Sequence, residues 1–323
     1  MLANNRFFAA LRMTRALRMT VALRMTAIAL VGIMALAGCQ KIEEKLIEEE
    51  PEVVPEQPSG SYTLTVEASK GADTKALSLD GSTLNAHWVT GETVAVYLGG
   101  AYKGLLTATA HGSDATRATL SGTLDNVDGV VAEAELTLLF PRSDWDYTGQ
   151  DGSAPSESGS LATKYDYATA TVTVASVSGS EVTTTGGASF VNEQSMYRFG
   201  FKAGGADPQI AIKGFTVSSA AGTLVRSRSW DGSAWAETFG PIAVEVAGEA
   251  LNLPYASLRN TRVGSGNGDS YSFSVIGSDN ALYLGSKDIP SSVMDVQGKF
   301  ISAQSVSVTK SNLAQGGTAT EAW

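Results

Sequence analysis

Hydrophobic residues recur at every second position along most of the chain from Ser61 onward. In the first such stretch, Tyr62, Leu64 and Val66 alternate with polar residues. Alternation of this kind over about four to eight residues predicts a half-buried antiparallel strand. The same period appears in further sets of residues: Val94/Val96/Leu98, Leu136/Leu138/Phe140, Val172/Val174, Tyr197/Phe199/Phe201, Ile242/Val244/Val246, Tyr271/Phe273/Val275 and Val306/Val308.

Glycine-rich turns separate these stretches, and no segment shows a helical stripe longer than about two turns. The pattern predicts an all-β protein with about 14 or more strands, which is too many for one sandwich. A polar stretch rich in Gly, Ser and Thr at 178–195 marks the boundary between two halves. We therefore predict two tandem antiparallel β-sandwich domains, an N-terminal one at 61–190 and a C-terminal one at 191–323.

The chain begins with a different pattern. Residues 1–38 contain five Arg and no acidic residue, and their apolar run at 25–38 is shorter than the roughly 20 residues that span a bilayer. A basic start followed by a short apolar core is typical of a secretory signal. The run ends in Leu36-Ala37-Gly38-Cys39, and small residues before the chain's only cysteine resemble the lipobox of bacterial lipoproteins.

This resemblance implies that 1–38 is a lipoprotein signal peptide and that Cys39 is lipidated and anchors the mature chain. Several acyl chains give stable anchoring where a single chain would be marginal. The alternative is an ordinary signal peptide with a chance cysteine. Residues 39–60 contain seven Glu, three Pro and no aromatic residue, which predicts an acidic flexible tether. Acidic residues soon after such a cysteine also resemble the surface-export signal of Bacteroidales lipoproteins.

Net charge changes once the leader is removed. The leader holds five of the 23 basic residues and none of the 33 acidic ones, leaving 18 bases against 33 acids and a net charge of −15. An acidic chain of this kind argues against a nucleic-acid partner, which requires a basic face. It also repels anionic lipid headgroups, so we expect the lipid on Cys39 to be the only contact with the membrane.

Residues for catalysis are scarce. One cysteine and two histidines, His87 and His111, leave no nucleophile–base pair, and no G-x-S-x-G sequence is present. The best metal candidate is the loop 144–151, but the twelfth position counted from Asp144 is Pro155, where a calcium loop requires Glu. We therefore predict that the protein is not an enzyme and holds no metal or cofactor.

Three tryptophans are candidates for glycan contact. Trp145 lies with Tyr147 among carboxylates, and Trp230 and Trp235 flank the turn at 231–233. An exposed aromatic ring beside carboxylates can stack on a sugar and hydrogen-bond it. The alternative interpretation is that these aromatics anchor turns against the sandwich. If they bind sugar, the chain would be a surface glycan-binding lipoprotein of a polysaccharide-uptake system.

Several segments, in this order, resemble the fimbrillins, the type V pilin-family lipoproteins of the Bacteroidales. Residues 88–97 resemble that family's W-x-x-G-D/E-x-V-x-V-Y segment, and 138–141 resemble its Y/F-P strand end. The start of the second domain, 197–201, and the last strands, from Lys299-Phe300 to 306–308, complete the resemblance. It implies two transthyretin-like β-sandwiches and an extracellular fimbrial (pilus) subunit, or an accessory or anchor subunit, that supports adhesion at the outer membrane.

The resemblance also implies a maturation step and partners. In fimbrillins a trypsin-like protease cuts after a base near the first strand, and a strand of a neighbouring subunit then fills the groove. Lys70 and Lys75 are the candidate cleavage sites here. The expected partners are other fimbrial subunits, the outer membrane, and a host protein or glycan. The 15 residues after Val308 show little alternation, so stalk, anchor, accessory and tip roles stay open.

Overall fold

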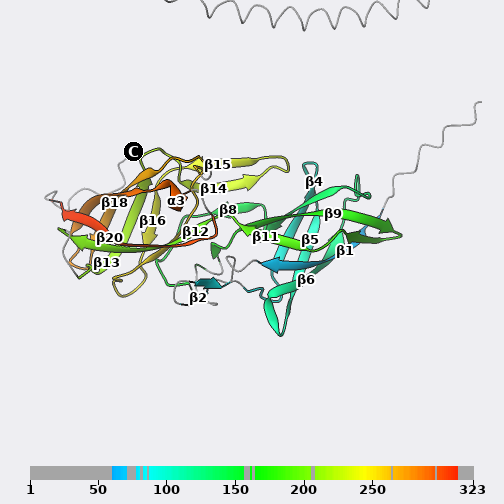
Figure 1. Cartoon of the computed structure of the whole chain (residues 1–323), viewed down its shortest axis with the longest axis horizontal. Helices are drawn as coiled ribbons and strands as arrows, with labels where there is room; N and C mark the ends of the chain where they lie inside the picture. The colour runs from blue at the N-terminus through cyan, green and yellow to red at the C-terminus, as the bar shows by residue number, and fades with distance from the viewer. Residues whose placement is uncertain are drawn as a thin grey trace, which may run out of the picture. The chain divides into compact units, whose positions relative to one another are not determined.

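Strands make up nearly all of the regular structure, as the alternation predicts (Figure 1). The computed structural model describes residues 60–70, 78–80, 83–85, 87–155, 161, 164–204, 208–262, 265–294 and 297–311. The predicted leader, Cys39, the tether and Lys75 lie outside these residues. No helix of the described part is long and apolar enough to cross a membrane. The prediction of an all-β fold is confirmed.

The first sheet closes on itself through β1 (Tyr62–Lys70), the first strand of the described residues. Its strands are β1, β4 (Thr93–Leu98), β5 (Ala101–His111), β6 (Asp114–Leu124), β7 (Glu135–Phe140), β9 (Ala168–Ser178), β10 (Glu181–Thr184) and β11 (Ala188–Asn192). Their order is β10-β1-β11-β9-β7-β4-β5-β6, and β1 also pairs with β6. The inward residues of these strands form one apolar core that includes Leu64, Val66, Trp88 and Phe190.

The second sheet has seven strands in the order β16-β13-β18-β19-β20-β12-β17. They are β12 (Ser195–Ala203), β13 (Ile212–Ser219), β16 (Ile242–Glu245), β17 (Tyr255–Leu258), β18 (Asp269–Gly277), β19 (Leu282–Ile289) and β20 (Phe300–Lys310). The one-turn helix α3 (Ser291–Met294) follows β19. The core of the second sheet is rich in aromatic rings. Phe199 lies edge-on to Phe215 and to Phe273, each at a centroid distance of 5.3 Å.

Two small sheets complete the described structure. One has the order β15-β14-β8, from β8 (Asp144–Asp146), β14 (Val225–Trp230) and β15 (Trp235–Phe239), and the other is the pair β2 (Ser78–Asp80) and β3 (Thr83–Asn85). Strand β8 lies within the predicted first domain, yet Trp145 and Tyr147 pack into the core of the second sheet. The boundary at 190/191 stays a prediction, and the segment around β8 crosses it.

Gln150 joins the two terminal strands of the second sheet. Its backbone oxygen accepts a hydrogen bond of 2.9 Å from the amide of Glu245, at the end of β16. Its side chain pairs with the backbone of Ser257 on β17 in both directions, at 2.7 and 2.8 Å. The side-chain amide thus takes the place of a peptide unit from a neighbouring strand, and it is 1% exposed. Each terminal strand of the second sheet therefore has at least one backbone pairing with Gln150.

Close approach of β5 and β6 depends on glycine. A Cβ on Gly122 would lie 2.1 Å from the backbone oxygen of Leu105. Only a shift of the backbone could relieve this clash. We expect Gly122→Ala to lower the free energy of unfolding by about 2 kcal/mol, as overpacking in a core does. The measurement is denaturant unfolding followed by circular dichroism.

The matched control is Gly112→Ala, in the turn of the same hairpin. Nothing lies within 4 Å of a Cβ at Gly112, so that variant should unfold like the parent. Equal stabilities for the two variants would contradict the close packing of β5 on β6.

Candidate functional site

Strand β1 lies between two strand edges and is paired with both. On one side it runs antiparallel to β6, from Tyr62 opposite Leu124 to Ser69 opposite Arg117. On the other side it runs parallel to β10 at its start and parallel to β11 at its end. The strand therefore supplies hydrogen bonds to β6 and to the β10–β11 edge at the same time. It is the segment that closes the first sheet.

The two faces of β1 follow the alternation of its sequence. Five residues point into the core and are 8% exposed or less: Tyr62, Leu64, Val66, Ala68 and Lys70. Outward, Glu67 accepts a hydrogen bond from Thr119 at 2.8 Å and lies 3.3 Å from His111 and 3.7 Å from Arg117. These outward contacts are solvent-exposed and each contributes little. Among the side chains of β1, those of the inward face therefore contribute most of the free energy that holds the strand in the first sheet.

Lys70 is the charged member of the inward face. Its side chain has no exposed area, and its Nζ lies 3.0 Å from Glu92 Oε2. The same nitrogen lies 3.7 Å from the ring centroid of Trp88 and 4.0 Å from that of Phe140. It also donates to the backbone oxygen of His87 at 3.5 Å. We call Trp88, Glu92 and Phe140 the cation cage, because two ring faces and a carboxylate surround one ammonium group.

The cation cage is held by strands other than β1. Trp88 donates its backbone N–H to Ala115 at 2.6 Å, and its ring packs edge-on against Phe140 and Phe190 at 5.4 and 5.3 Å. Glu92 Oε2 also accepts the backbone N–H of Val89 at 3.0 Å. These supporting residues lie outside β1, and two of them, Ala115 and Phe190, belong to β6 and β11, the strands that β1 joins.

The two predicted cleavage sites differ in what the structure shows of them. Lys70 ends β1, and its side chain is buried and paired with Glu92, so cleavage after Lys70 stays a prediction. Lys75 lies outside the described residues, so cleavage there stays a prediction. Cys39, the predicted lipidation site, also lies outside them.

The three tryptophans of the glycan hypothesis lie together, and Trp235 contacts both of the others. Trp145 stacks on Tyr167 at 5.1 Å and contacts Trp235 at 4.2 Å, and it is 1% exposed. The ring centroids of Trp235 and Trp230 are 5.3 Å apart. The guanidinium carbon of Arg228 lies over the Trp235 ring, 3.7 Å from its centroid. Trp145 has no exposed face for a sugar, and its indole N–H donates a hydrogen bond of 2.6 Å to the backbone oxygen of Arg142. Glycan contact through Trp230 and Trp235 stays a prediction.

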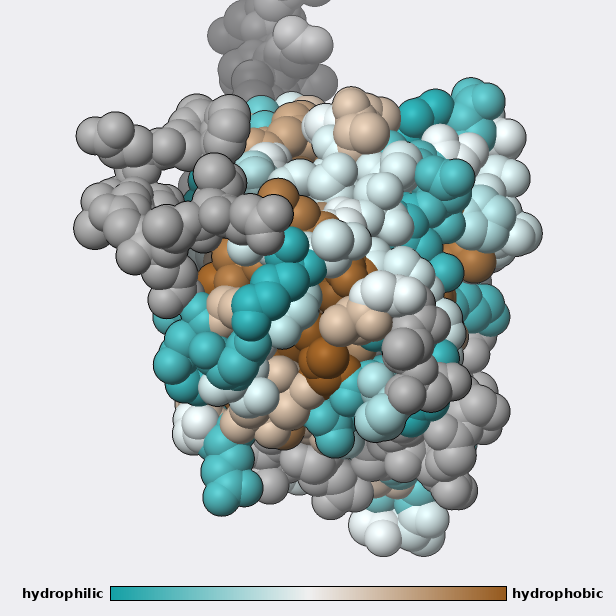
Figure 2. Space-filling model, turned by 90° about the vertical axis from the view of Figure 1, so that its left-hand side faces the viewer, coloured by the Kyte–Doolittle hydropathy of each residue, from teal (hydrophilic) through white to brown (hydrophobic). Residues whose placement is uncertain are grey.

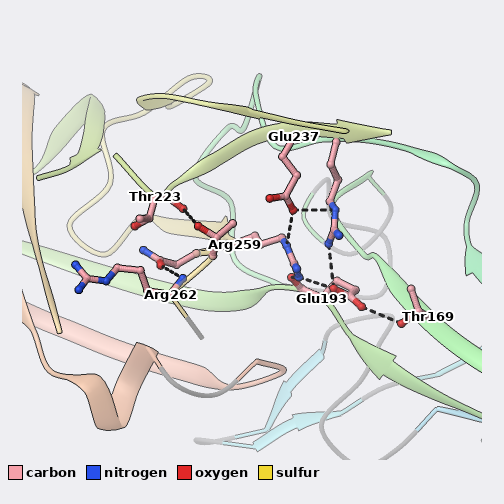
Figure 3. A network of polar contacts seen from close by, with 9 residues as sticks. Thr169, Glu193, Thr223, Glu237, Arg259 and Arg262 are labelled. Carbon is pink, nitrogen blue, oxygen red and sulfur yellow. Dashed lines mark hydrogen bonds and ion pairs between the residues drawn. The ribbon is translucent and has the colours of Figure 1, made fainter. Parts of the chain in front are cut away.

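A network of four charged residues lies beside these rings, with Arg228 buried and the other three half-buried (Figure 3). Glu193 Oε2 lies 3.1 Å from Arg228 and is also paired with Arg259, while Glu237 Oε1 lies 3.3 and 3.6 Å from the same two arginines. Thr169 on β9 donates to Glu193 at 2.8 Å. Burial lowers the pKa of Arg228 from its ordinary value, and the positive charge of Arg259 lowers it further.

Two positive and two negative charges balance within this network. Breaking one buried pair would leave an uncompensated charge, so the network favours a single arrangement of its strands. Thr169 belongs to the first sheet, and Arg228 and Glu237 to the β15-β14-β8 sheet. The network therefore connects strands of the first sheet with those of the β15-β14-β8 sheet.

The remaining sequence candidates take part in turns. Asp146 accepts hydrogen bonds from the N–H and hydroxyl of Thr148, each at 2.8 Å, and Asp151 does the same for Ser153 at 3.0 and 2.7 Å. These are Asx turns, which shape the loop without a metal. Within the described residues no group of three or more His, Cys, Asp or Glu could hold a metal ion.

Two functional features were not found from the sequence. The cation cage has a readable signal, because Lys70 continues the inward phase set by Tyr62, Leu64, Val66 and Ala68. The role of Gln150 has none, since a single glutamine in a loop carries no pattern. The partners of both are distant in the chain.

One end of the second sheet shows apolar surface among polar residues (Figure 2). Leu284 on β19 is 44% exposed and lies opposite Thr309 near the end of β20, and Leu282 begins the same strand. Exposed apolar residues are common on folded proteins, so we assign no ligand to this face.

Comparisons with known proteins were made at three levels. No protein-family model matches the chain, and no curated protein does. Among solved structures, a candidate cell adhesion protein of Bacteroides uniformis is similar at 14% identity and a TM-score of 0.41, covering 77% of this chain and 97% of its own. A fimbrial protein of Bacteroides ovatus is similar at 8% identity and a TM-score of 0.32, covering 78% and 50%.

A shaft pilin of Lactobacillus rhamnosus is also similar, at 10% identity and a TM-score of 0.30, covering 79% of this chain and 99% of its own. The identities and TM-scores are low. We therefore base the proposed function on the arrangement of the strands.

Buried tyrosines of the second core predict an alkaline transition. Burial raises the pKa of Tyr147, Tyr167 and Tyr197 above the ordinary value of 10.0, and raises that of Tyr271 to about 12. Each pKa is higher in the folded state, so the stability they contribute is complete below pH 10 and is lost as the pH rises through the folded values.

The measurement is tyrosinate absorbance together with circular dichroism, from about pH 9 to about pH 13. This interval begins below the pKa of about 10 at which the phenols of the unfolded chain titrate. We expect these phenols to ionise only as the strands unfold. Complete ionisation near pH 10 in a protein that keeps its circular dichroism would contradict their burial.

Proposed function

We propose that the protein is a cell-surface fimbrial subunit, or an accessory or anchor subunit of a fimbrium, which assembles by exchange of β1. The observation that carries this proposal is the pairing of β1 with β6 on one side and with β10 and β11 on the other. It is the first described strand, so one cut after it separates it from the rest of the sheet.

Removal of β1 would leave a slot with two unpaired edges. The N–H and C=O groups of β6 and of the β10–β11 edge would lose their partners, and the apolar core beneath would be exposed. A strand from a neighbouring subunit restores both the hydrogen bonds and the apolar contacts. The same interaction that completes the folded chain then joins one subunit to the next.

The part of the chain before β1 fits an anchor in this proposal. Lipid on Cys39 would hold the precursor to the outer membrane, and the acidic tether would carry the sheets away from it. A cut after Lys75 would release lipid, tether and β1 together. A subunit that is not cut keeps its lipid and serves as the anchor, and a fibre of such subunits supports adhesion to a host protein or glycan.

Assembly can be tested with a charge-removing variant at the predicted cut. In cells that make the fimbrium, we expect unboiled samples of the parent to give a ladder of multimers on gels. Lys75→Gln should abolish the ladder, because β1 stays attached and fills its own slot. Lys164→Gln, at an exposed lysine away from the slot, is the matched control and should polymerise like the parent.

A ladder that persists unchanged in Lys75→Gln would contradict maturation at this site. A parent protein that is monomeric and uncut would exclude the stalk role and leave the anchor role.

Lipidation can be tested at the single cysteine. We expect labelled palmitate to be incorporated into the parent, which should partition into detergent with the outer membrane. Cys39→Ser should lose both the label and the membrane association, because the acidic chain offers the bilayer no second attachment. A Cys39→Ser protein that remains in the membrane fraction would contradict the lipid anchor.

A further inference from the structure

We propose that the slot left by β1 selects an incoming strand that carries a lysine or arginine at the position of Lys70. The proposal rests on the proposed function and names the chemistry of the partner strand. The cation cage makes the selection, because its residues stay with the sheet when β1 leaves.

The cage is built before the strand enters it. Trp88 and Glu92 precede β4, and Phe140 ends β7, so none of the three belongs to the strand that is exchanged. The supporting contacts of Trp88 with Ala115 and Phe190 and of Glu92 with Val89 likewise do not involve β1. A slot without β1 therefore keeps a negative, aromatic-walled pocket at one end.

An apolar residue would not satisfy this pocket. The side chain of Glu92 is only 22% exposed, so without a cation its carboxylate stays partly desolvated and unpaired by charge. The ring faces of Trp88 and Phe140 attract a cation but offer a neutral chain only ordinary contact. A second carboxylate would be repelled. Only a basic side chain can pair with the carboxylate of Glu92 and also make cation–π contacts with the rings of Trp88 and Phe140.

The pocket also fixes the register of the strand. Successive inward residues are two positions apart, about 6.6 Å along a strand, so a slip of one step would move the cation out of the cage. Ala68, the preceding inward residue, lies opposite Ala118 on β6 and Ala188 on β11, both fully buried. All three strands thus place alanine in that row. The partner strand is therefore expected to read apolar-x-apolar-x-apolar-x-small-x-basic.

The experiment uses the chain with a specific protease site placed within 71–77. After the cut, β1 is held only by noncovalent contacts, and labelled peptides of residues 61–70 compete for the slot. We expect the affinity of the Lys70→Arg peptide for the slot to be within a few-fold of the affinity of the parent peptide. Lys70→Met, of similar length but neutral, should bind more weakly by on the order of tenfold, and Lys70→Glu more weakly still.

A second protein variant assigns the preference to the cage. In Glu92→Gln the carboxylate is absent, so the difference between the Lys70 and Lys70→Met peptides should shrink to a few-fold or less. Circular dichroism verifies that this variant is folded. A scrambled peptide reports non-specific binding.

The outcomes separate the selectivity from the exchange itself. If all the peptides enter the parent slot equally well, or if the preference is unchanged in Glu92→Gln, cation selection is overturned while strand exchange stands. If no peptide enters and β1 never leaves, the slot is not exchangeable and both proposals are overturned.

Discussion

Pairing of strand edges is the constraint on which the two large sheets depend. The first sheet meets it with a strand, since β1 satisfies β6 on one side and β10 and β11 on the other. The second sheet meets it with a loop, since Gln150 pairs with β16 through its backbone and with β17 through its side chain. Both solutions hide the backbone groups that would otherwise recruit another chain.

These two closures differ in how they can be undone. Strand β1 lies ahead of all the strands that it joins, so one cut in the chain frees it. Gln150 is connected on both sides to parts of the same core, through Tyr147 before it and the Tyr255–Gly152 hydrogen bond of 3.0 Å after it. A single cut does not release it. We therefore propose strand exchange for the first sheet only.

The sequence predicts the faces of strands better than their partners. Alternation identified β1, β7, β12 and β18, because the period reports which side of a strand is buried. It could not identify the closure of the first sheet, which joins β1 to residues 48 or more positions away, as in the pair Ser69 and Arg117. It also missed the three-residue β8, which is too short to show a period, and so assigned Trp145 and Tyr147 to the first domain.

Aromatic residues next to carboxylates indicate a sugar site only if the rings are exposed, and exposure depends on the fold. Trp145 is covered by Tyr167 and Trp235, which lie 22 and 90 residues further along the chain. Lys70 shows the opposite case. Its inward phase was readable, yet its partners Trp88 and Phe140 follow from pairing that no local pattern reports.

Hydrogen exchange of the cut chain, measured before and after β1 is washed out, tests the account most directly. The account predicts that amides of β6, β10 and β11 lose protection when β1 leaves, while those of β12, β13 and β18 keep theirs. Protection should return on addition of the 61–70 peptide. Loss of protection throughout both sheets, or no change at β6, would contradict the claim that β1 is an exchangeable closing strand.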